Sequence, residues 1–302
     1  MIEAGLIFAR FVHYAAAMAL FGVSLFPLYS YPSRAGPQPA RLSLWMQTVL
    51  FAAAGTAFVS AILWLAFATA NMAGDLSAAI DADALWSVIG DTAFGHVWIL
   101  RLALSSTLIL LVGYSRFFRP GHSQTVVTTI GAAALLATLA GTGHTMKMDG
   151  MQSAAHIASD SAHLLAAGAW FGGLLALSIV LKAASPDAPA ILSRFSGMGY
   201  MAVATLVGSG LINSWFLVGS PSNLVATAYG QLLLAKLVLF AGMLGLAIVN
   251  RFWLVPALTK GCNDVHTSAE RLRRHVYAEQ EFGFLVILIV SVLGTMEPAI
   301  GH

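Results

Sequence analysis

Soft metal ligands are concentrated in one short segment, residues 144–151, which reads His-Thr-Met-Lys-Met-Asp-Gly-Met. The segment offers one imidazole, from His144, and three thioethers, from Met146, Met148 and Met151. Thioether and imidazole ligands together favour Cu(I) and similar soft ions, whereas Mg²⁺ and Ca²⁺ prefer oxygen. The segment therefore predicts a copper ion as ligand, with Cu(I) favoured over Cu(II). The alternative is an ordinary flexible loop in a chain rich in methionine.

The helix expected directly after this segment carries three polar residues on one face. His156 and His163 are almost two helical turns apart, and Asp160 lies between them at spacings of four and three residues. A carboxylate so placed can orient a ligating imidazole through its second ring nitrogen. We therefore expect these residues to extend the metal site. The alternative is that His156 lies among lipid headgroups and His163 bonds only Asp160.

The elements that position these residues must be membrane helices. The chain is 58% hydrophobic and only 9% charged, too little polar surface to solvate a soluble globule of this size. A spanning helix needs roughly 20 mainly apolar residues, and eight stretches qualify. They are residues 4–29, 43–70, 94–115, 124–143, 155–182, 196–218, 229–254 and 277–296.

The predicted fold class is thus an all-α polytopic membrane protein with eight transmembrane helices, with the lipid bilayer as its main partner. The loops are too short for a separate soluble domain, and no Gly-rich ATP-binding motif is found in the sequence. Nothing indicates a nucleic-acid partner. We therefore expect a binding or transport protein and not an enzyme.

The orientation in the membrane follows from the basic residues of the loops. Cytoplasmic loops are enriched in Lys and Arg, and eleven such residues fall on alternate loops, against Lys147 alone on the opposite set. The eleven are Arg34, Arg41, Arg116, Arg119, Lys182, Arg194, Arg251, Lys260, Arg271, Arg273 and Arg274. Both termini and the segment 144–151 are therefore expected outside the cytoplasm.

Ionisable residues inside a bilayer are costly and by default indicate function. Six are expected in the outer half of the spans, roughly 8 to 15 Å deep at 1.5 Å per residue. They are Arg10, His13, Arg101, Asp160, His163 and Lys236. The alternative is an ion pair between Arg10 and Asp160 that joins two helices, with the histidines bonded to backbone or hydroxyl groups.

Two further histidines could complete a metal site with His163. His13 lies in the first span, and His96 lies at the outer mouth of the third, where it equally suits the lipid interface. The inner half is expected to be poorer in ligands, with no ladder of soft ligands across the membrane. Its expected polar residues are Ser209, Asn213, Glu279 and Glu281, and Met198, Met201 and Met243 offer scattered thioethers.

The chain also matches itself at two places. Thr92-Ala-Phe-Gly95 precedes Arg101 at the spacing at which Thr227-Ala-Tyr-Gly230 precedes Lys236. His13 likewise precedes Phe21-Gly22 as His163 precedes Phe171-Gly172. We therefore expect two parallel four-helix repeats, residues 1–145 and 146–302, related by an axis along the membrane normal. The alternative is a chance likeness between apolar helices.

The second half contains several motifs in a fixed order. They are Asp160, His163, Trp170 and Gly172-Gly173, then Arg194-Phe195-Ser196, then Tyr229-Gly230 before Lys236, and Asn250-Arg251-Phe252 before Pro256. Together these motifs resemble the copper resistance protein D (CopD) family. The first half is similar more loosely, through Phe94-Gly95 and Arg101. The resemblance implies an eight-span protein of the bacterial inner membrane that moves copper from the periplasm to the cytoplasm. It also implies a small periplasmic copper-binding partner, here as a separate protein.

Three functions remain open from the sequence. The first is copper uptake from the periplasm, and the second is a periplasm-facing copper receptor or store without translocation. The third is a haem-binding electron carrier, because membrane helix bundles often bind haem through histidines on facing helices.

Overall fold

The computed structural model describes residues 1–31, 40–118, 121–140, 151–183, 187–259 and 265–299. Every regular element in these ranges is helical. The long helices are α1 (Ile2–Ser30), α2 (Ala40–Ala73), α4 (Ala93–Phe117), α5 (His122–Ala137), α6 (Met151–Lys182), α7 (Ala188–Val218), α9 (Ala228–Val249) and α11 (Val265–Leu293). The short ones are η1 (Leu76–Ala79), α3 (Ala82–Asp91), α8 (Pro221–Ala226), the π-helix η3 (Asn250–Leu254) and α10 (Val255–Thr259).

Seven helices in the described part of the chain are long and apolar enough to cross a membrane. This confirms the all-α polytopic membrane architecture. The remaining expected span, residues 124–143, corresponds to α5, which has 16 residues. At 1.5 Å per residue α5 is about 24 Å long, shorter than the roughly 30 Å of a hydrocarbon core. The eight expected spans are therefore seven full-length helices and one short helix.

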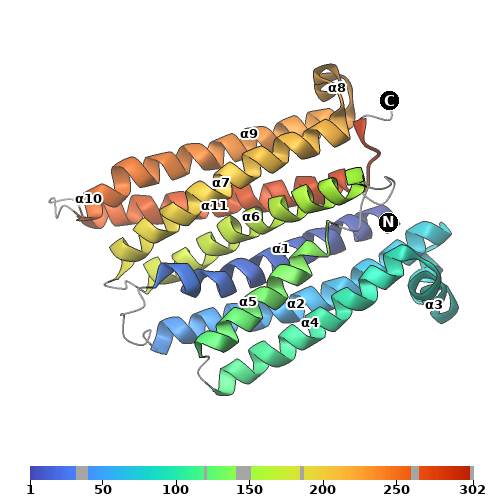
Figure 1. The fold of residues 1–302 in the computed structure, drawn as a ribbon, viewed down its shortest axis with the longest axis horizontal. Coiled ribbons are helices and arrows are strands. Elements are labelled where there is room, and N and C mark those ends of the chain that lie inside the picture. The colour runs from blue at the N-terminus through green and yellow to red at the C-terminus, as the bar shows by residue number, and fades with distance from the viewer. Residues whose placement is uncertain (32–39, 119–120, 141–150, 184–186, 260–264, 300–302) are drawn as a thin grey trace.

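The helices form two groups around a central pair (Figure 1). Helices α1 and α6 pack side by side, with α2 and α5 against α1 and with α7 and α11 against α6. Helix α4 packs on α2 and α5, and α9 packs on α11. Helix α1 begins and α11 ends at the same end of the bundle, which also carries α3 and α8. We call this the terminal end.

Glycines bring the backbones of α1 and α6 into direct contact. A Cβ atom placed on Gly172 would lie 2.6 Å from the Cα of Gly22, and one placed on Gly22 would collide with the carbonyl oxygen of Gly168. Small residues at membrane helix crossings allow such close approach. The crossing holds the two helix groups together and fixes the level of α6 relative to α1.

The start of α4 and the start of α9 are built alike. Thr92 Oγ1 accepts from the Gly95 amide at 2.9 Å and donates to the Val88 carbonyl at 2.6 Å. Thr227 makes the same two bonds, from the Gly230 amide at 3.0 Å and to the Asn223 carbonyl at 2.7 Å. In both cases the threonine caps the helix. These matched contacts support the expected duplication of residues 1–145 and 146–302, which stays a prediction.

Candidate metal site

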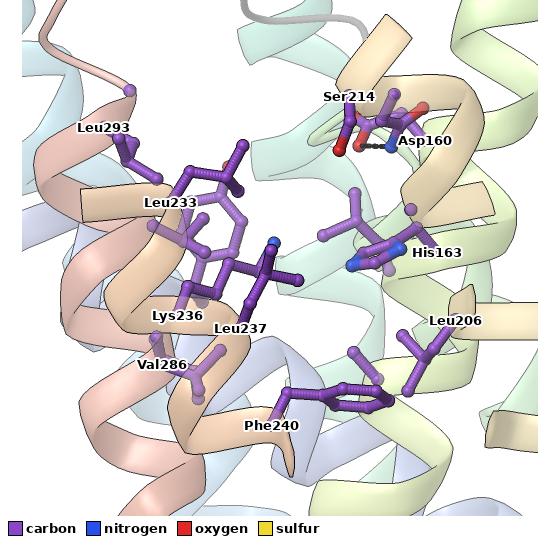
Figure 2. Close-up of a pocket in the computed structure, with 18 of the residues that line it drawn as sticks. Asp160, His163, Leu206, Ser214, Leu233, Lys236, Leu237, Phe240, Val286 and Leu293 are labelled. Atoms are coloured by element: carbon purple, nitrogen blue, oxygen red, sulfur yellow. Dashed lines mark hydrogen bonds between the residues drawn. The ribbon is translucent and has the colours of Figure 1, made fainter. Parts of the chain in front are cut away.

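A cavity of about 410 Å³ lies among α1, α6, α7, α9 and α11 (Figure 2). Its polar residues lie toward the terminal end, and apolar side chains form its deeper part. The polar lining residues are Arg10, Tyr14, His156, Asp160, His163, Asn213, Ser214, Tyr229 and Lys236. Five of the residues singled out in the sequence therefore share one cavity: Arg10, His156, Asp160, His163 and Lys236.

His163 is held with one ring nitrogen free for a ligand. Its Nδ1 lies 3.0 Å from Ser209 Oγ, and that hydroxyl donates its own proton to the Thr205 carbonyl at 2.5 Å. Ser209 can therefore only accept from the ring, so Nδ1 carries the proton and Nε2 keeps its lone pair. No hydrogen bond of Nε2 is found among the described residues. In metal-binding histidines, one ring nitrogen typically donates to such a partner while the other binds the metal.

Asp160 and His156 lie one and two turns nearer the terminal end. The Asn213 amide donates to Asp160 Oδ1 at 3.2 Å, and Lys236 and His156 are its ionisable neighbours. The ring of His156 stacks on Phe216 at 4.7 Å, and its Nδ1 is buried without a hydrogen-bond partner among the described residues. Figure 2 shows Lys236 and His163 extending toward each other from α9 and α6. The Asp160 carboxylate is therefore surrounded by the nitrogen-bearing side chains of Asn213, Lys236 and His156.

The expected alternative, an Arg10 to Asp160 ion pair, is not formed among the described residues. Arg10 Nη1 donates to the Gly294 carbonyl at 2.9 Å, and the guanidinium lies 5.0 Å from the ring of Trp64. Arg10 therefore ties α1 to the end of α11 and lines the cavity without neutralising Asp160.

His13 occupies the matching position in the first half, but it does not line the cavity. Its Nδ1 lies 3.0 Å from both Ser60 Oγ and the Ala57 carbonyl, and Ser60 donates to the Thr56 carbonyl at 2.6 Å. This repeats the bonds of His163 with Ser209 and Thr205. Aromatic rings fill the surroundings of His13, because Trp64 packs edge-on to it at 5.7 Å. His13 and His163 therefore do not share this cavity.

Arg101, the counterpart of Lys236, is also enclosed in the first half. Its guanidinium lies 4.1 Å from the ring of Trp98, which packs on Trp64 at 5.0 Å. Its Nε and Nη2 donate to Thr138 Oγ1 and to the Thr138 carbonyl, at 3.1 and 3.0 Å. Trp64, Trp98 and Arg101 thus fill the space around His13, whereas the corresponding space beside His163 is a cavity.

The remaining expected ligands are not gathered at the cavity. His96 is exposed at the start of α4, in the other helix group. His144, Met146 and Met148 lie outside the described residues, and so does the side chain of Met151 at the start of α6. Within the described ranges, no group of three or more His, Cys, Asp or Glu side chains is close enough to hold one ion. A metal in the cavity would need other ligands as well.

Four further residues lie at or beside the cavity: Asn213, Met18 and Met243 line it, and Ser209 contacts His163 without lining it. Ser209 and Asn213 were expected in the inner half, and this is wrong, because α7 runs toward the terminal end and places them level with His163 and Asp160. Met18 of α1 and Met243 of α9 line the deeper part, beside Phe171. The repeat of Thr56 and Ser60 as Thr205 and Ser209 is a sequence signal that could have indicated Ser209, but it does not extend to Asn213. Met18 carries no such signal, and Met243 was expected only as a scattered thioether of the inner half.

One side of the cavity reaches the outer surface of the bundle. Val207 and Leu211 of α7 and Leu237 of α9 line the cavity and are themselves exposed. Helices α7 and α9 do not pack closely on each other, whereas their counterparts α2 and α4 do. In a membrane this gap would face acyl chains.

These features define a polytopic helical membrane protein with a partly polar cavity among five of its helices. Residues 1–155 match the family described as "Copper resistance protein D-like, N-terminal domain", and residues 189–293 match "Copper resistance protein D". The chain belongs to the copper resistance protein D family.

Curated relatives agree with this assignment. Copper resistance protein D of Pseudomonas syringae pv. tomato is 32% identical over 96% of this chain and 95% of its own length. Inner membrane protein YebZ of Escherichia coli is 28% identical over 96% of this chain and 97% of its own. Copper transport protein CutJ of Bacillus subtilis is 31% identical over 80% of this chain and 45% of its own. No solved structure matches significantly.

Proposed function

We propose that this protein takes up copper from the periplasm toward the cytoplasm and that the cavity receives the ion within the membrane. The observation that carries the proposal is that one cavity is lined by His163, whose Nε2 is unprotonated, and by Met18 and Met243. Imidazole and thioether ligands suit copper, and the thioethers favour Cu(I). Family membership supports a role in copper homeostasis.

The ligands would act in sequence as an ion descends. Asp160 and His156 lie nearest the terminal end and would attract a cation from the surface. His163 lies below them, and Met18 and Met243 lie deeper still. Each step passes the ion to softer ligands, so Cu(I) is stabilised over Na⁺ or Mg²⁺ along the way. Lys236 opposes this attraction, which would keep the site from holding the ion too tightly.

The proposed orientation places the terminal end in the periplasm of the inner membrane, as the loop charges indicate. The segment 144–151 would then capture copper outside, directly before α6. A small periplasmic copper-binding protein would deliver the ion to this segment. Because the sequence contains no ATP-binding motif, the driving force must be the copper gradient or a coupled ion.

Copper uptake into proteoliposomes tests this function. Purified protein would be reconstituted into lipid vesicles that contain a Cu(I) chelator. Cu(I) would then be added outside the vesicles together with ascorbate. Accumulation of the coloured complex inside, above that of protein-free vesicles, is the expected result. Binding without accumulation would instead indicate a receptor or store. A haem absorption band in the purified protein would indicate the electron carrier, although His13 does not face His163 across the cavity.

Replacing both thioethers should slow uptake without unfolding the protein. In a Met18→Leu, Met243→Leu variant the apolar volume is nearly kept, and such exchanges usually cost less than about 1.5 kcal/mol each. The soft ligands below His163 are lost, so we expect a lower maximal uptake rate. Met198→Leu is the matched control, because Met198 packs near Gly173 and does not line the cavity. Equal rates in all three proteins would contradict thioether participation.

A further inference from the structure

A second polar cluster lies beyond the deep end of the cavity. The Glu279 side chain of α11 is 2% exposed, and its Oε1 accepts from the Asn250 amide at 2.7 Å. The side-chain amide oxygen of Asn250, Oδ1, in turn lies 2.8 Å from His275 Nδ1. Since that oxygen can only accept, Nδ1 of His275 donates the proton. The orientation of Asn250 is thus fixed from both sides.

The π-helix η3 presents Asn250 to this cluster. Asn250 is the first residue of η3, where the turns of α9 widen. A π-turn interrupts the regular helical bonding, and such turns occur frequently at functional sites. Here the irregular turn faces α11 and places a buried amide between a carboxyl group and a histidine. Helix packing alone requires neither the Glu279 carboxyl group nor the His275 ring at these positions.

One aromatic residue separates the cluster from the cavity. Trp170 lines the cavity, packs edge-on to Phe240 at 5.9 Å, and donates its indole N–H to the Glu279 carboxylate. Gly283, also in the cavity lining, lies one turn from Glu279 on the same face of α11. Glu279 is therefore the first carboxyl group below the cavity floor, on the side away from the terminal end.

No cation balances the Glu279 carboxylate among the described residues. Trp170 faces it from α6 and Asn250 from η3, and His275 of its own helix reaches it only through Asn250. No bond or ion pair joins the neighbouring Arg251 to it, and no charged side chain of α1, α9 or α10 contacts it in the described ranges. A buried carboxylate without a cation is strongly disfavoured in a membrane. The group must therefore hold a proton or receive a cation.

We propose that Glu279 is a proton-binding site that releases its proton when copper occupies the deep end of the cavity, on the other side of Trp170. This inference rests on the proposed uptake function and adds a proton release and return to it. When Cu(I) reaches the thioether of Met243 in the cavity, its charge favours ionised Glu279, so the O–H bond of the carboxylic acid breaks and the proton leaves toward the cytoplasmic side, where His275 lies. One positive charge replaces another, so the site stays neutral overall. When the copper ion leaves, a proton returns to the carboxylate.

Infrared spectroscopy of the reconstituted full chain tests the proton site directly. Without copper, the wild-type protein should show the C=O stretching band of a protonated, buried carboxylic acid. Addition of Cu(I) with ascorbate should remove this band. Glu279→Gln should lack it from the start, because the amide keeps an oxygen for Asn250 and Trp170 but carries no acid proton. Glu281→Gln, two residues away and exposed, is the matched control and should keep it.

Uptake measurements then separate this inference from the proposed function. Acidification of the vesicle interior should slow wild-type and Glu281→Gln uptake, whereas Glu279→Gln should lose this pH dependence. If the wild type accumulates no copper, the uptake function fails, but the copper-sensitive band still decides whether Glu279 is a proton site. A band that survives Glu279→Gln, or is missing from the wild type, overturns the inference. So does a wild-type band that Cu(I) leaves unchanged.

Discussion

His163→Ala should abolish copper uptake while the protein stays folded and inserted in the membrane. The cavity has no other imidazole at this depth, since His156 lies two turns nearer the terminal end and His13 lies outside it. Without His163, an ion at Asp160 meets a hard oxygen ligand and then Lys236, neither of which suits Cu(I). The measurement is the initial rate of Cu(I) accumulation in proteoliposomes, normalised to folded protein.

Two variants serve as controls for His163→Ala. His13→Asn changes the equivalent position of the first half, where the amide can still donate to the Ala57 carbonyl, and folded protein should keep near-normal uptake. Met148→Ala, in the segment 144–151, should only shift the copper concentration for half-maximal uptake, because neighbouring ligands can replace one thioether. A normal maximal rate in folded His163→Ala would favour a surface receptor over a buried histidine relay.

Gly22→Leu should largely prevent the protein from folding. The added side chain would meet the backbone of α6 at Gly168 and Gly172, so the two central helices would have to separate. Overpacking against movable side chains typically costs about 1 to 3 kcal/mol, and a rigid backbone contact should cost at least as much. Thermal unfolding and size-exclusion chromatography in detergent would measure the loss.

Gly55→Leu is the matched control for Gly22→Leu. Gly55 lies in another membrane helix, α2, and a Cβ atom added there meets nothing within 4 Å. Its unfolding temperature should therefore stay close to that of the wild type. If both variants unfold alike, the loss reflects glycine replacement in general and not the crossing of α1 and α6.

The sequence predicted the part of the site that one helix determines. The helical period placed His156, Asp160 and His163 on one face, and they line one cavity. The shortness of α5 could not be foreseen, because the apolar run continues through residue 140 while the helix ends at Ala137. Met18 was not singled out and Met243 was expected only as a scattered thioether, because their approach depends on how α1 and α9 pack around α6.

The sequence also could not predict that the space beside His163 is open while the space beside His13 is filled. His13 and His163 have the same serine partner, and only the packing of Trp64 and Trp98 closes the space beside His13. A local motif records the bonds of a side chain but not the volume left around it. The misplacement of Ser209 and Asn213 had a simpler cause, which was the direction in which α7 crosses the membrane.

The gap between α7 and α9 makes the surrounding lipid part of the binding site. Where Val207, Leu211 and Leu237 leave the protein wall open, an acyl chain must complete it and exclude water from the thioethers. The polarity around a bound ion, and so its affinity, should then vary with chain length and unsaturation. If the cavity binds copper as proposed, the fatty-acid composition of the membrane would therefore tune that binding, and a detergent micelle would change it.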